Sequence, residues 1–344
     1  MIILAIDFDI MKLIRYILFP FVPIYYFVTW LRNKLYDLGW KSSTAYDIPI
    51  ICVGNLSVGG TGKTPTIEYL IRMLSQNYNV AILSRGYKRK SSGFIIADEH
   101  ATAASIGDEP FQFYTKFKDI IVAVDVDRRQ GISKLLKQKQ PDIILLDDAF
   151  QHRKVKAGFN ILLTAHGNLY VDDFVLPTGN LREPKSGAKR ADVIVVTKCP
   201  ETMSKSEKVS IINRLKPLPN QEVFFSSIHY SEKVWKGNQS NVLSELIKQE
   251  FTLVTGIANP KPLVDFLKSK DLQFEHLKFK DHHNFTGEDI SKLKTKKIIL
   301  TTEKDYVRLL PYFKDESELY YLPIEFIIDP IDLFEKSINS FLKL

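Results

Sequence analysis

The stretch GNLSVGGTGKTPT, residues 54–66, decides the fold of this chain through what stands on either side of it. An apolar run, Ile48–Val53, precedes it and is typical of a buried strand, and Ile67–Leu74 follows with the apolar spacing of a helix. A strand, a glycine-rich turn, a Gly-Lys-Thr triplet and a helix, in that order, predict a phosphate-binding P-loop.

In such a loop, backbone N–H groups and the positive end of the helix dipole face an anion. The residues expected to bind the nucleotide are Ser57, Val58, Gly59, Gly60, Thr61, Gly62, Lys63 and Thr64. Lys63 would reach the β- and γ-phosphates, and the Thr64 hydroxyl would ligate Mg²⁺. The strict motif has glycine at the position of Ser57, but the rest of it is intact. We therefore expect a nucleotide site here rather than a purely structural turn.

Composition sets broad limits on the fold and on the partners. With 344 residues, 45% apolar and 25% charged, the chain has room for one large or two medium α/β domains and excludes a disordered protein. The net charge of +7 indicates an acidic partner, which could be nucleic acid, anionic lipid or a phosphorylated small molecule. Cys52 and Cys199 lie in apolar runs and form neither a disulfide framework nor a zinc spacing, which suits a reducing compartment.

The N-terminal stretch Leu13–Leu31 is almost wholly apolar and aromatic, and basic residues flank it. Pro20 and Pro23 interrupt it, and its length is borderline against the roughly 20 residues that a membrane span needs. Three interpretations stay open: a helix in the membrane interface, which we favour, a core helix, and a true span. No signal-peptide cleavage site follows it. Met11 resembles a natural start more than Met1 does, and two interpretations of residues 1–10 stay open, a misplaced start and a family-specific extension.

From Ile48 onwards short apolar runs alternate with helical segments, which predicts a parallel sheet covered by helices on both faces. The strands expected first are 48–53, 80–84, 120–124, 143–146, 161–164 and 193–197, with 223–229 after a polar helix. After a polar connection at 236–241, a second alternation predicts strands at 251–255, 274–279, 297–301 and 319–322 and a helix at 260–270. We expect a membrane-associated segment (1–42), a P-loop domain (43–225) and a smaller second α/β domain (226–344).

Asp147 and Asp148 directly follow the apolar run Ile143–Leu146. They stand at the carboxyl end of a buried strand, where α/β sheets hold their ligands. This is the Walker-B arrangement, in which an acid completes the Mg²⁺ shell. The alternative is a pair of acids that caps the next turn, and the P-loop favours the metal role.

Other candidate residues leave their roles more open. Lys198 matches the lysine of the guanine-reading motif, but Pro200 stands where that motif needs Asp, so adenine is the default base. Asp108, within Gly107–Pro110, is more readily a helix N-cap than a catalytic residue on sequence alone. In residues 281–283, Asp-His-His, a metal cluster is disfavoured, and either a histidine that orients a carboxylate or an exposed loop remains.

Three arginines stand where a phosphorylated substrate could use them. Arg85 and Arg128 follow strand ends, and Arg182 lies in a glycine- and proline-rich loop. Arginine binds phosphate in a fork and stays charged, although each of the three could equally form a surface ion pair.

Together these motifs resemble those of the tetraacyldisaccharide 4′-kinases, the lipid A 4′-kinase family of Gram-negative bacteria. The resemblance is carried, in the family's order, by residues 54–65, 84–87, 107–110, 146–153, 176–184, 255–260, 281–283 and 301–305. In this family Ser or Thr is usual at the position of Ser57.

The resemblance implies a P-loop kinase at the cytoplasmic face of the inner membrane, peripheral or monotopic, with ATP and Mg²⁺ as cofactors. It would phosphorylate the 4′-hydroxyl of a tetraacylated glucosamine disaccharide 1-phosphate to give lipid IVA. Its partners would be this lipid and the membrane surface, with no nucleic acid and no obligate protein partner.

The resemblance also implies roles for single residues. Asp108 would be the base, with His282 as its partner. Lys63 and Arg182 would act on the phosphate, and Thr64, Asp147 and Asp148 would form the metal site.

Two other functions stay open. A P-loop GTPase or metal-insertion ATPase would need a base-reading Asp near Lys198 or a Cys/His relay, and the sequence shows neither. A nucleotide-dependent membrane scaffold would bind ATP without phosphorylating any lipid.

Overall fold

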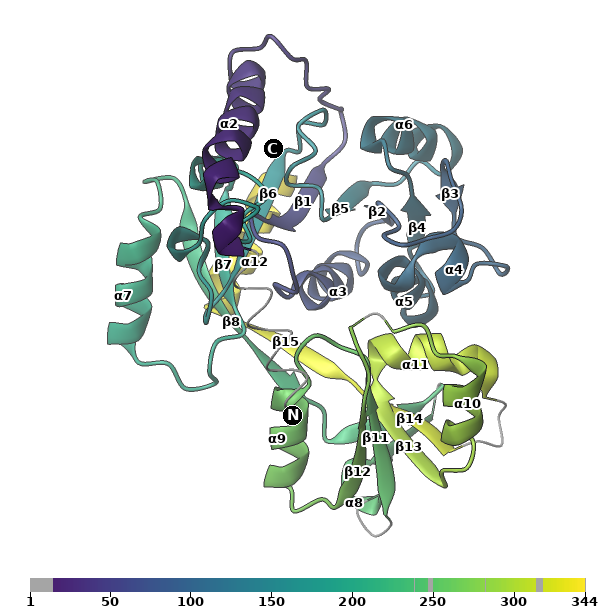
Figure 1. Ribbon diagram of the computed structural model, residues 1–344. Helices are drawn as coiled ribbons and strands as arrows, with labels where there is room; N and C mark the ends of the chain where they lie inside the picture. Colours follow the sequence, from purple (N-terminus) through teal and green to yellow (C-terminus); the bar gives the residue numbers. More distant parts are fainter. Residues whose placement is uncertain (1–14, 238, 247–249, 282, 314–317, 344) are drawn as a thin grey trace. The chain divides into compact units, whose positions relative to one another are not determined.

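The computed structural model describes residues 15–343 apart from residues 238, 247–249, 282 and 314–317 (Figure 1). The chain forms two compact units. The first holds the residues up to Arg85 together with Asp119–Ser227 and Ile327–Leu344, and the second holds Gly86–Lys118 and Ile228–Phe326. The α/β fold with a parallel sheet and flanking helices, expected from the sequence, is confirmed.

The first unit is built on a sheet with the strand order β15-β8-β7-β6-β1-β5-β2-β4. Its strands are β1 Ile50–Asn55, β2 Val80–Ser84, β4 Ile121–Val124, β5 Ile143–Asp147, β6 Phe159–Ala165, β7 Val193–Thr197, β8 Glu222–Tyr230 and β15 Ile324–Asp329. The pairings from β8 to β4 are parallel. Every residue of β1, β2, β5 and β7 is buried, which is why these strands read as continuous apolar runs.

Helices cover this sheet. They are η1 Phe19–Phe21, α2 Val22–Asp37, α3 Lys63–Leu74, α6 Arg128–Gln138, η2 Tyr170–Asp172, η3 Lys185–Arg190, α7 Lys205–Leu215 and α12 Ile331–Leu342. In the C-terminal helix α12, Phe334 contacts the rings of Tyr69 in α3 and Phe224 in β8. The Tyr69 hydroxyl also donates to Glu335 at 2.7 Å. These contacts place the C-terminus in the first unit rather than in the contiguous range 226–344.

The second unit has its own sheet, with the order β10-β9-β14-β13-β11-β12. Strands β14, β13, β11 and β12 are parallel, and β9 is antiparallel to both of its neighbours. Its elements are β3 Ile95–Ile96, α4 Ala103–Ile106, α5 Asp108–Lys116, β9 Lys233–Lys236, β10 Gln239–Val242, α8 Leu243–Leu246, β11 Phe251–Thr255, α9 Lys261–Ser269, β12 Phe274–Lys278, α10 Gly287–Leu293, β13 Ile298–Thr302, α11 Glu303–Leu309, η4 Leu310–Tyr312 and β14 Glu318–Leu322.

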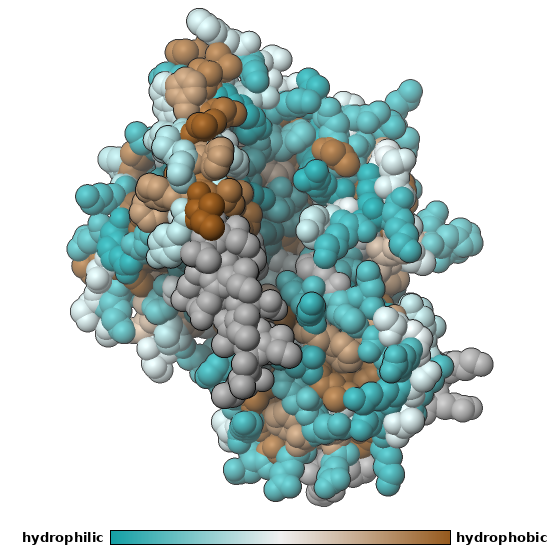
Figure 2. All heavy atoms as spheres, in the orientation of Figure 1, coloured by the Kyte–Doolittle hydropathy of each residue, from teal (hydrophilic) through white to brown (hydrophobic). Residues whose placement is uncertain are grey.

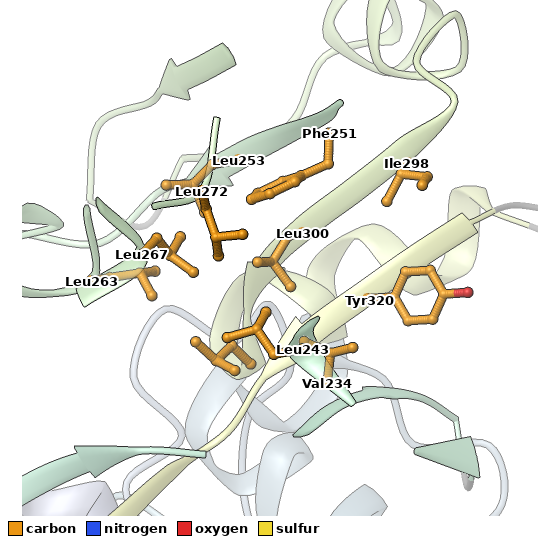
Figure 3. Close-up of a cluster of buried hydrophobic side chains, with 11 residues drawn as sticks. Val234, Leu243, Phe251, Leu253, Leu263, Leu267, Leu272, Ile298, Leu300 and Tyr320 are labelled. Atoms are coloured by element: carbon orange, nitrogen blue, oxygen red, sulfur yellow. The ribbon is translucent and has the colours of Figure 1, made fainter. Parts of the chain in front are cut away.

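Both faces of this second sheet are covered. Leu253 of β11 belongs to a cluster with Leu263 and Leu267 of α9 (Figure 3). Its neighbour Val254 belongs to a different cluster, with Leu293 of α10. This alternation follows from the two-residue period of a strand, which turns successive side chains to opposite faces.

Two segments differ from the sequence expectation. Residues 236–241, expected to be a polar connection, contribute to the antiparallel pair β9–β10. Because β10 is exposed at each of its residues, no buried side chain marks it in the sequence. Residues 86–118 were expected in the range 43–225 but belong to the second unit, where α5 packs against α11.

The N-terminal prolines open helices rather than interrupt one. Pro20 and Pro23 lie in the first turns of η1 and α2, where the missing N–H has no helical partner to lose. Of the residues of α2, all of which the structure describes, Asn33 alone is buried. Figure 2 shows apolar side chains gathered over this helix. Among the residues that the structure describes, no helix has the length and apolarity to cross a membrane.

We expect Gly54→Ala to lower the free energy of unfolding by about 1–3 kcal/mol, the usual range for an overpacked core. Gly54 lies in β1, and a Cβ added there would come within 2.7 Å of the Phe150 Cβ. Urea denaturation would measure the loss. Gly167→Ala is the control, because its new Cβ would meet nothing within 4 Å. Equal unfolding free energies for the two variants would contradict the close approach at Gly54.

Candidate active site

The loop between β1 and α3 is held along one side by a second loop. The Val58 N–H donates to the Asn180 carbonyl at 2.8 Å, and the Arg182 N–H donates to the Leu56 carbonyl at 2.7 Å. These bonds run between backbone groups, so the first half of the P-loop pairs like a short strand with residues 180–182. The path of the loop is therefore fixed by the loop that carries Arg182.

The end of β7 holds the other half of the loop. The Thr197 hydroxyl donates to the Thr61 carbonyl at 2.8 Å, and the Lys198 ammonium donates to the Gly60 carbonyl at 2.5 Å. Burial lowers the pKa of Lys198, and the nearby charge of Lys63 lowers it further. Lys198, considered from the sequence as a base-reading residue, is thus in contact with the P-loop backbone.

The N-terminus of α3 is shaped to receive an anion. Gly62 precedes the helix with φ 85°, a left-handed conformation that glycine adopts without strain. No side chain caps this end of the helix, and its first turn contains no acidic residue. The N–H groups and the positive end of the helix dipole therefore meet no anionic side chain of their own helix.

Lys63 and Arg182 meet at Asp148, in the turn that follows β5. The Arg182 guanidinium binds the Asp148 carboxylate as a bidentate fork: Nη1 donates to Oδ2 at 3.1 Å, and Nη2 donates to Oδ1 at 2.8 Å. Lys63 Nζ lies 3.8 Å from the same Oδ2. Burial raises the pKa of Asp148, but Lys63 and Arg182 together outweigh it and hold that pKa below its ordinary value. The carboxylate is therefore ionised at neutral pH.

Asn55 completes this cluster and was not singled out from the sequence. It is the last residue of β1 and is fully buried. Its Nδ2 donates to the Thr61 hydroxyl at 2.7 Å, and its Oδ1 accepts from the Arg182 guanidinium. The sequence signal that could have identified Asn55 is a polar amide at the end of an apolar run. Asn55 connects the P-loop to the arginine that holds Asp148.

Asp147 and Arg128 lie beside this cluster. Asp147, the last residue of β5, is buried and accepts from the Ser84 hydroxyl at 3.1 Å. Arg128, the first residue of α6, is buried, and its guanidinium donates to the Val126 carbonyl at 3.1 Å. Burial lowers the pKa of Arg128, although both aspartates oppose that effect. Arg85, the third candidate arginine, is exposed.

Glu183 links the site to the N-terminal helix. Its carboxylate, 1% exposed, accepts from Asn33 of α2 at 2.5 Å, from Gln151 at 3.0 Å and from Arg190 at 2.6 Å. The Tyr25 hydroxyl of α2 donates to the carbonyl of the preceding Arg182 at 2.9 Å. Helix α2 therefore holds two successive residues of the arginine loop.

The second unit contains a separate cluster around Asp108. Asp108 is the first residue of α5, and Gly107 rather than Asp108 occupies the N-cap position. Two nitrogens of Arg308, Nε at 3.0 Å and Nη2, donate to Oδ2 of Asp108. The third, Nη1, donates to Asp305 at 3.2 Å. The N-cap interpretation of Asp108 is therefore wrong, and its carboxylate is bound by an arginine instead.

Buried Asp305 joins three of the sequence motifs. It accepts from the Gly256 N–H at 2.7 Å and from the Thr302 hydroxyl at 2.9 Å. The motifs at 107–110, 255–260 and 301–305 thus meet through Arg308, a residue outside all three motifs. The signal was its spacing of three residues from Asp305 on a helix, which puts both side chains on one face.

Of the Asp-His-His segment, the structure describes Asp281 and His283. His282, the predicted partner of Asp108, lies outside the residues that the structure describes. The neighbouring His283 stacks on Phe279 and shares a 2.9 Å hydrogen bond with Asp289 of α10. That hydrogen bond lowers the pKa of Asp289. His283 therefore has a local partner within its own segment.

Comparison with known proteins adds independent findings. The family model described as tetraacyldisaccharide-1-P 4′-kinase matches residues 14–343. The chain is 51% identical to a tetraacyldisaccharide 4′-kinase of Flavobacterium johnsoniae, over 97% of this chain and 98% of that one. It is 46% identical to a protein of the same description from Bacteroides thetaiotaomicron, over 90% and 87% of the two chains.

A solved structure is similar over nearly the whole chain. The crystal structure of LpxK from Aquifex aeolicus in complex with ATP superposes with a TM-score of 0.79 at 29% sequence identity. The match covers 96% of this chain and 99% of that one.

We expect His152→Gln to reduce the loss of stability on acidification. Burial, with the charge of Arg128, lowers the pKa of His152 to about 4, whereas an unfolded histidine titrates near 6.5. Between these values the unfolded chain binds the proton more tightly, so stability falls as the pH drops from about 6.5 towards 4. Urea denaturation at about pH 7 and about pH 5 would measure this. An equal loss in wild type and variant would contradict it.

Proposed function

This chain belongs to the tetraacyldisaccharide-1-P 4′-kinase family, and we propose that it transfers the γ-phosphate of ATP to the 4′-hydroxyl of an acylated glucosamine disaccharide 1-phosphate. The observation that supports phosphoryl transfer most directly is the cluster at the start of α3. There Lys63 and Arg182 surround the ionised Asp148 beside a helix N-terminus that no side chain caps. Phosphoryl transfer depends mostly on positioning and on charge stabilisation, and this cluster offers both.

ATP is the proposed phosphate donor. The structurally similar Aquifex aeolicus protein was solved in complex with ATP, and the present chain has a P-loop motif at residues 54–66. Pro200 stands where a guanine-reading motif has Asp, and Lys198 contacts the Gly60 carbonyl. The missing Asp favours ATP over GTP.

Mg²⁺ is the proposed metal, and the oxygen atoms beside the P-loop fit it. The Asp147 and Asp148 carboxylates and the Thr64 hydroxyl are hard ligands of the kind that Mg²⁺ prefers. Within the described residues, no three His, Cys, Asp or Glu side chains gather to hold a metal by themselves. Phosphate oxygens would therefore complete its shell. When bound, the ion would neutralise part of the charge on the phosphates.

The residues of the chain have separable roles in this proposal. Lys63 and Arg182 donate to phosphate oxygens, and the fork to Asp148 keeps Arg182 in one orientation. Asp108 accepts the proton of the sugar hydroxyl, a step typically worth 10²–10⁴-fold in rate. His282 remains the proposed partner of Asp108.

Helix α2 is the proposed membrane contact, at the cytoplasmic face of the inner membrane. Ile24, Phe27 and Trp30 are 61%, 56% and 40% exposed, and the rings of Phe27 and Trp30 pack against each other. Such a surface suits a helix that lies at the membrane interface. A lipid substrate would be met at the same surface.

We expect purified protein to transfer label from γ-labelled ATP to an acylated disaccharide 1-phosphate in mild detergent with Mg²⁺. Lys63→Ala should lower this rate by roughly 10²–10³-fold, the usual effect of removing one donor to a developing negative charge. Its unfolding midpoint should stay unchanged, because Lys63 is not among the buried core residues. Lys205→Ala, at an exposed position of α7, is the control and should keep full activity.

Other outcomes of this assay would replace the proposal. Free labelled phosphate without labelled lipid would indicate an ATPase or GTPase of another class. Bound ATP with neither product would indicate a nucleotide-dependent scaffold.

We expect Phe27→Ser and Trp30→Ser to weaken binding to vesicles that contain anionic lipid, measured by co-sedimentation. Each loss should be roughly tenfold or more, because burying one such side chain is worth about 1.5–3 kcal/mol. Val209→Ser is the control, since Val209 is 54% exposed and belongs to a different helix, α7. Unchanged sedimentation of both aromatic variants would place the membrane contact elsewhere.

A further inference from the structure

Helices α5 and α11 of the second unit meet through charged side chains that are largely withdrawn from water. The Arg308 side chain is 8% exposed, and that of Asp305 is fully buried. The side chain of Asp108, the second acidic partner of Arg308, is 21% exposed. A buried charge is costly unless it is paired, so this arrangement calls for an explanation beyond helix packing.

The geometry fixes the Asp108 carboxylate rather than merely neutralising it. Nε and Nη2 of Arg308 both donate to the same oxygen, Oδ2. The planar guanidinium cannot rotate without losing its third bond, from Nη1 to Asp305. The Asp108 carboxylate is therefore fixed by two donors of one rigid guanidinium, that of Arg308.

Asp305 is in turn anchored by backbone. It accepts from the Gly256 N–H and from the Thr302 hydroxyl. A Cβ at Gly256 would come within 2.8 Å of Asp305 Oδ1, so only glycine allows this approach. The anchor of Arg308 thus depends on the turn after β11 and on the start of α11.

Arg308 has a second acidic partner besides Asp108. The Arg308 guanidinium pairs with both Asp108 and Asp305, so its positive charge acts on two carboxylates. The neighbouring charges Glu109 of α5 and Lys304 of α11 lie 3.3 Å apart and offset each other. The Asp108 carboxylate is therefore oriented by an arginine that has a second acidic partner.

We propose that Arg308 is a positioning residue that aims the Asp108 carboxylate at the substrate hydroxyl, with Asp305 as its anchor. The inference rests on the proposed role of Asp108 as proton acceptor. A purely structural ion pair between α5 and α11 would make a different prediction, namely lower stability without a changed rate per folded molecule.

The test compares Arg308→Gln, Arg308→Lys and Asp108→Asn with wild type in the lipid phosphorylation assay. We expect Arg308→Gln to lower kcat by about 10–100-fold, the range for a misplaced reacting group, with little change in KM for ATP. The acid limb of its kcat/KM profile should move to higher pH, because Asp108 loses its cationic neighbour. Arg308→Lys keeps a charge but not the fork. It should restore the acid limb and only part of kcat.

Lys116→Gln is the matched control. Lys116 of α5 pairs with Glu303 of α11 at 2.5 Å, so its loss removes a cation between the same two helices. Positioning predicts that Arg308→Gln loses kcat while Lys116→Gln keeps it. A purely structural role predicts that both variants lose stability and that both keep the wild-type kcat and pH profile.

The outcomes separate the inference from the proposed function. An Asp108→Asn enzyme with normal kcat would remove the proposed base and the inference with it. A slow Asp108→Asn enzyme alongside an Arg308→Gln enzyme with normal kcat and pH profile would overturn the inference alone. If Arg308→Gln does not fold, Arg308→Lys decides: full kcat in that variant overturns the inference.

Discussion

The fork between Arg182 and Asp148 is the interaction on which the first unit's site depends. Arg182 reaches Asp148 after β5 and Asn55 at the end of β1, so one guanidinium connects two neighbouring strands of the sheet. The backbone of the same residue pairs with the P-loop at Leu56. A change in the position of Arg182 would therefore displace the P-loop, Asp148 and the end of β1 together.

Each unit fixes one aspartate with an arginine fork, and the surroundings give the two carboxylates different chemistry. Asp148 faces Lys63 as well as Arg182, and its lowered pKa keeps it ionised, which suits an oxygen ligand for a cation. Asp108 shares its arginine with buried Asp305. The Asp148 carboxylate thus lies between two cations beside the P-loop, whereas the Asp108 carboxylate is oriented by one arginine that is itself anchored.

The sequence predicted the elements whose residues follow a buried pattern, and it failed where no such pattern exists. β7 and β11 lie at the expected residues because each is buried along its whole length. β10 is an exposed edge strand, and residues 86–118 join the second unit through contacts with α11, which is distant in sequence. Lys63 and Asp148 were found from local motifs, whereas Arg308 is defined by tertiary contact with Asp108.

The N-terminal helix combines two requirements that usually exclude each other. Its exposed aromatic face suits a membrane, but Asn33 donates to buried Glu183, next to Arg182. With 16 residues α2 is about 24 Å long, less than the roughly 30 Å of a bilayer core. The helix therefore has one exposed apolar face, and polar contacts from Tyr25 and Asn33 keep it on the protein. A helix held in this way keeps the arginine loop and the exposed apolar face of α2 in a fixed relation.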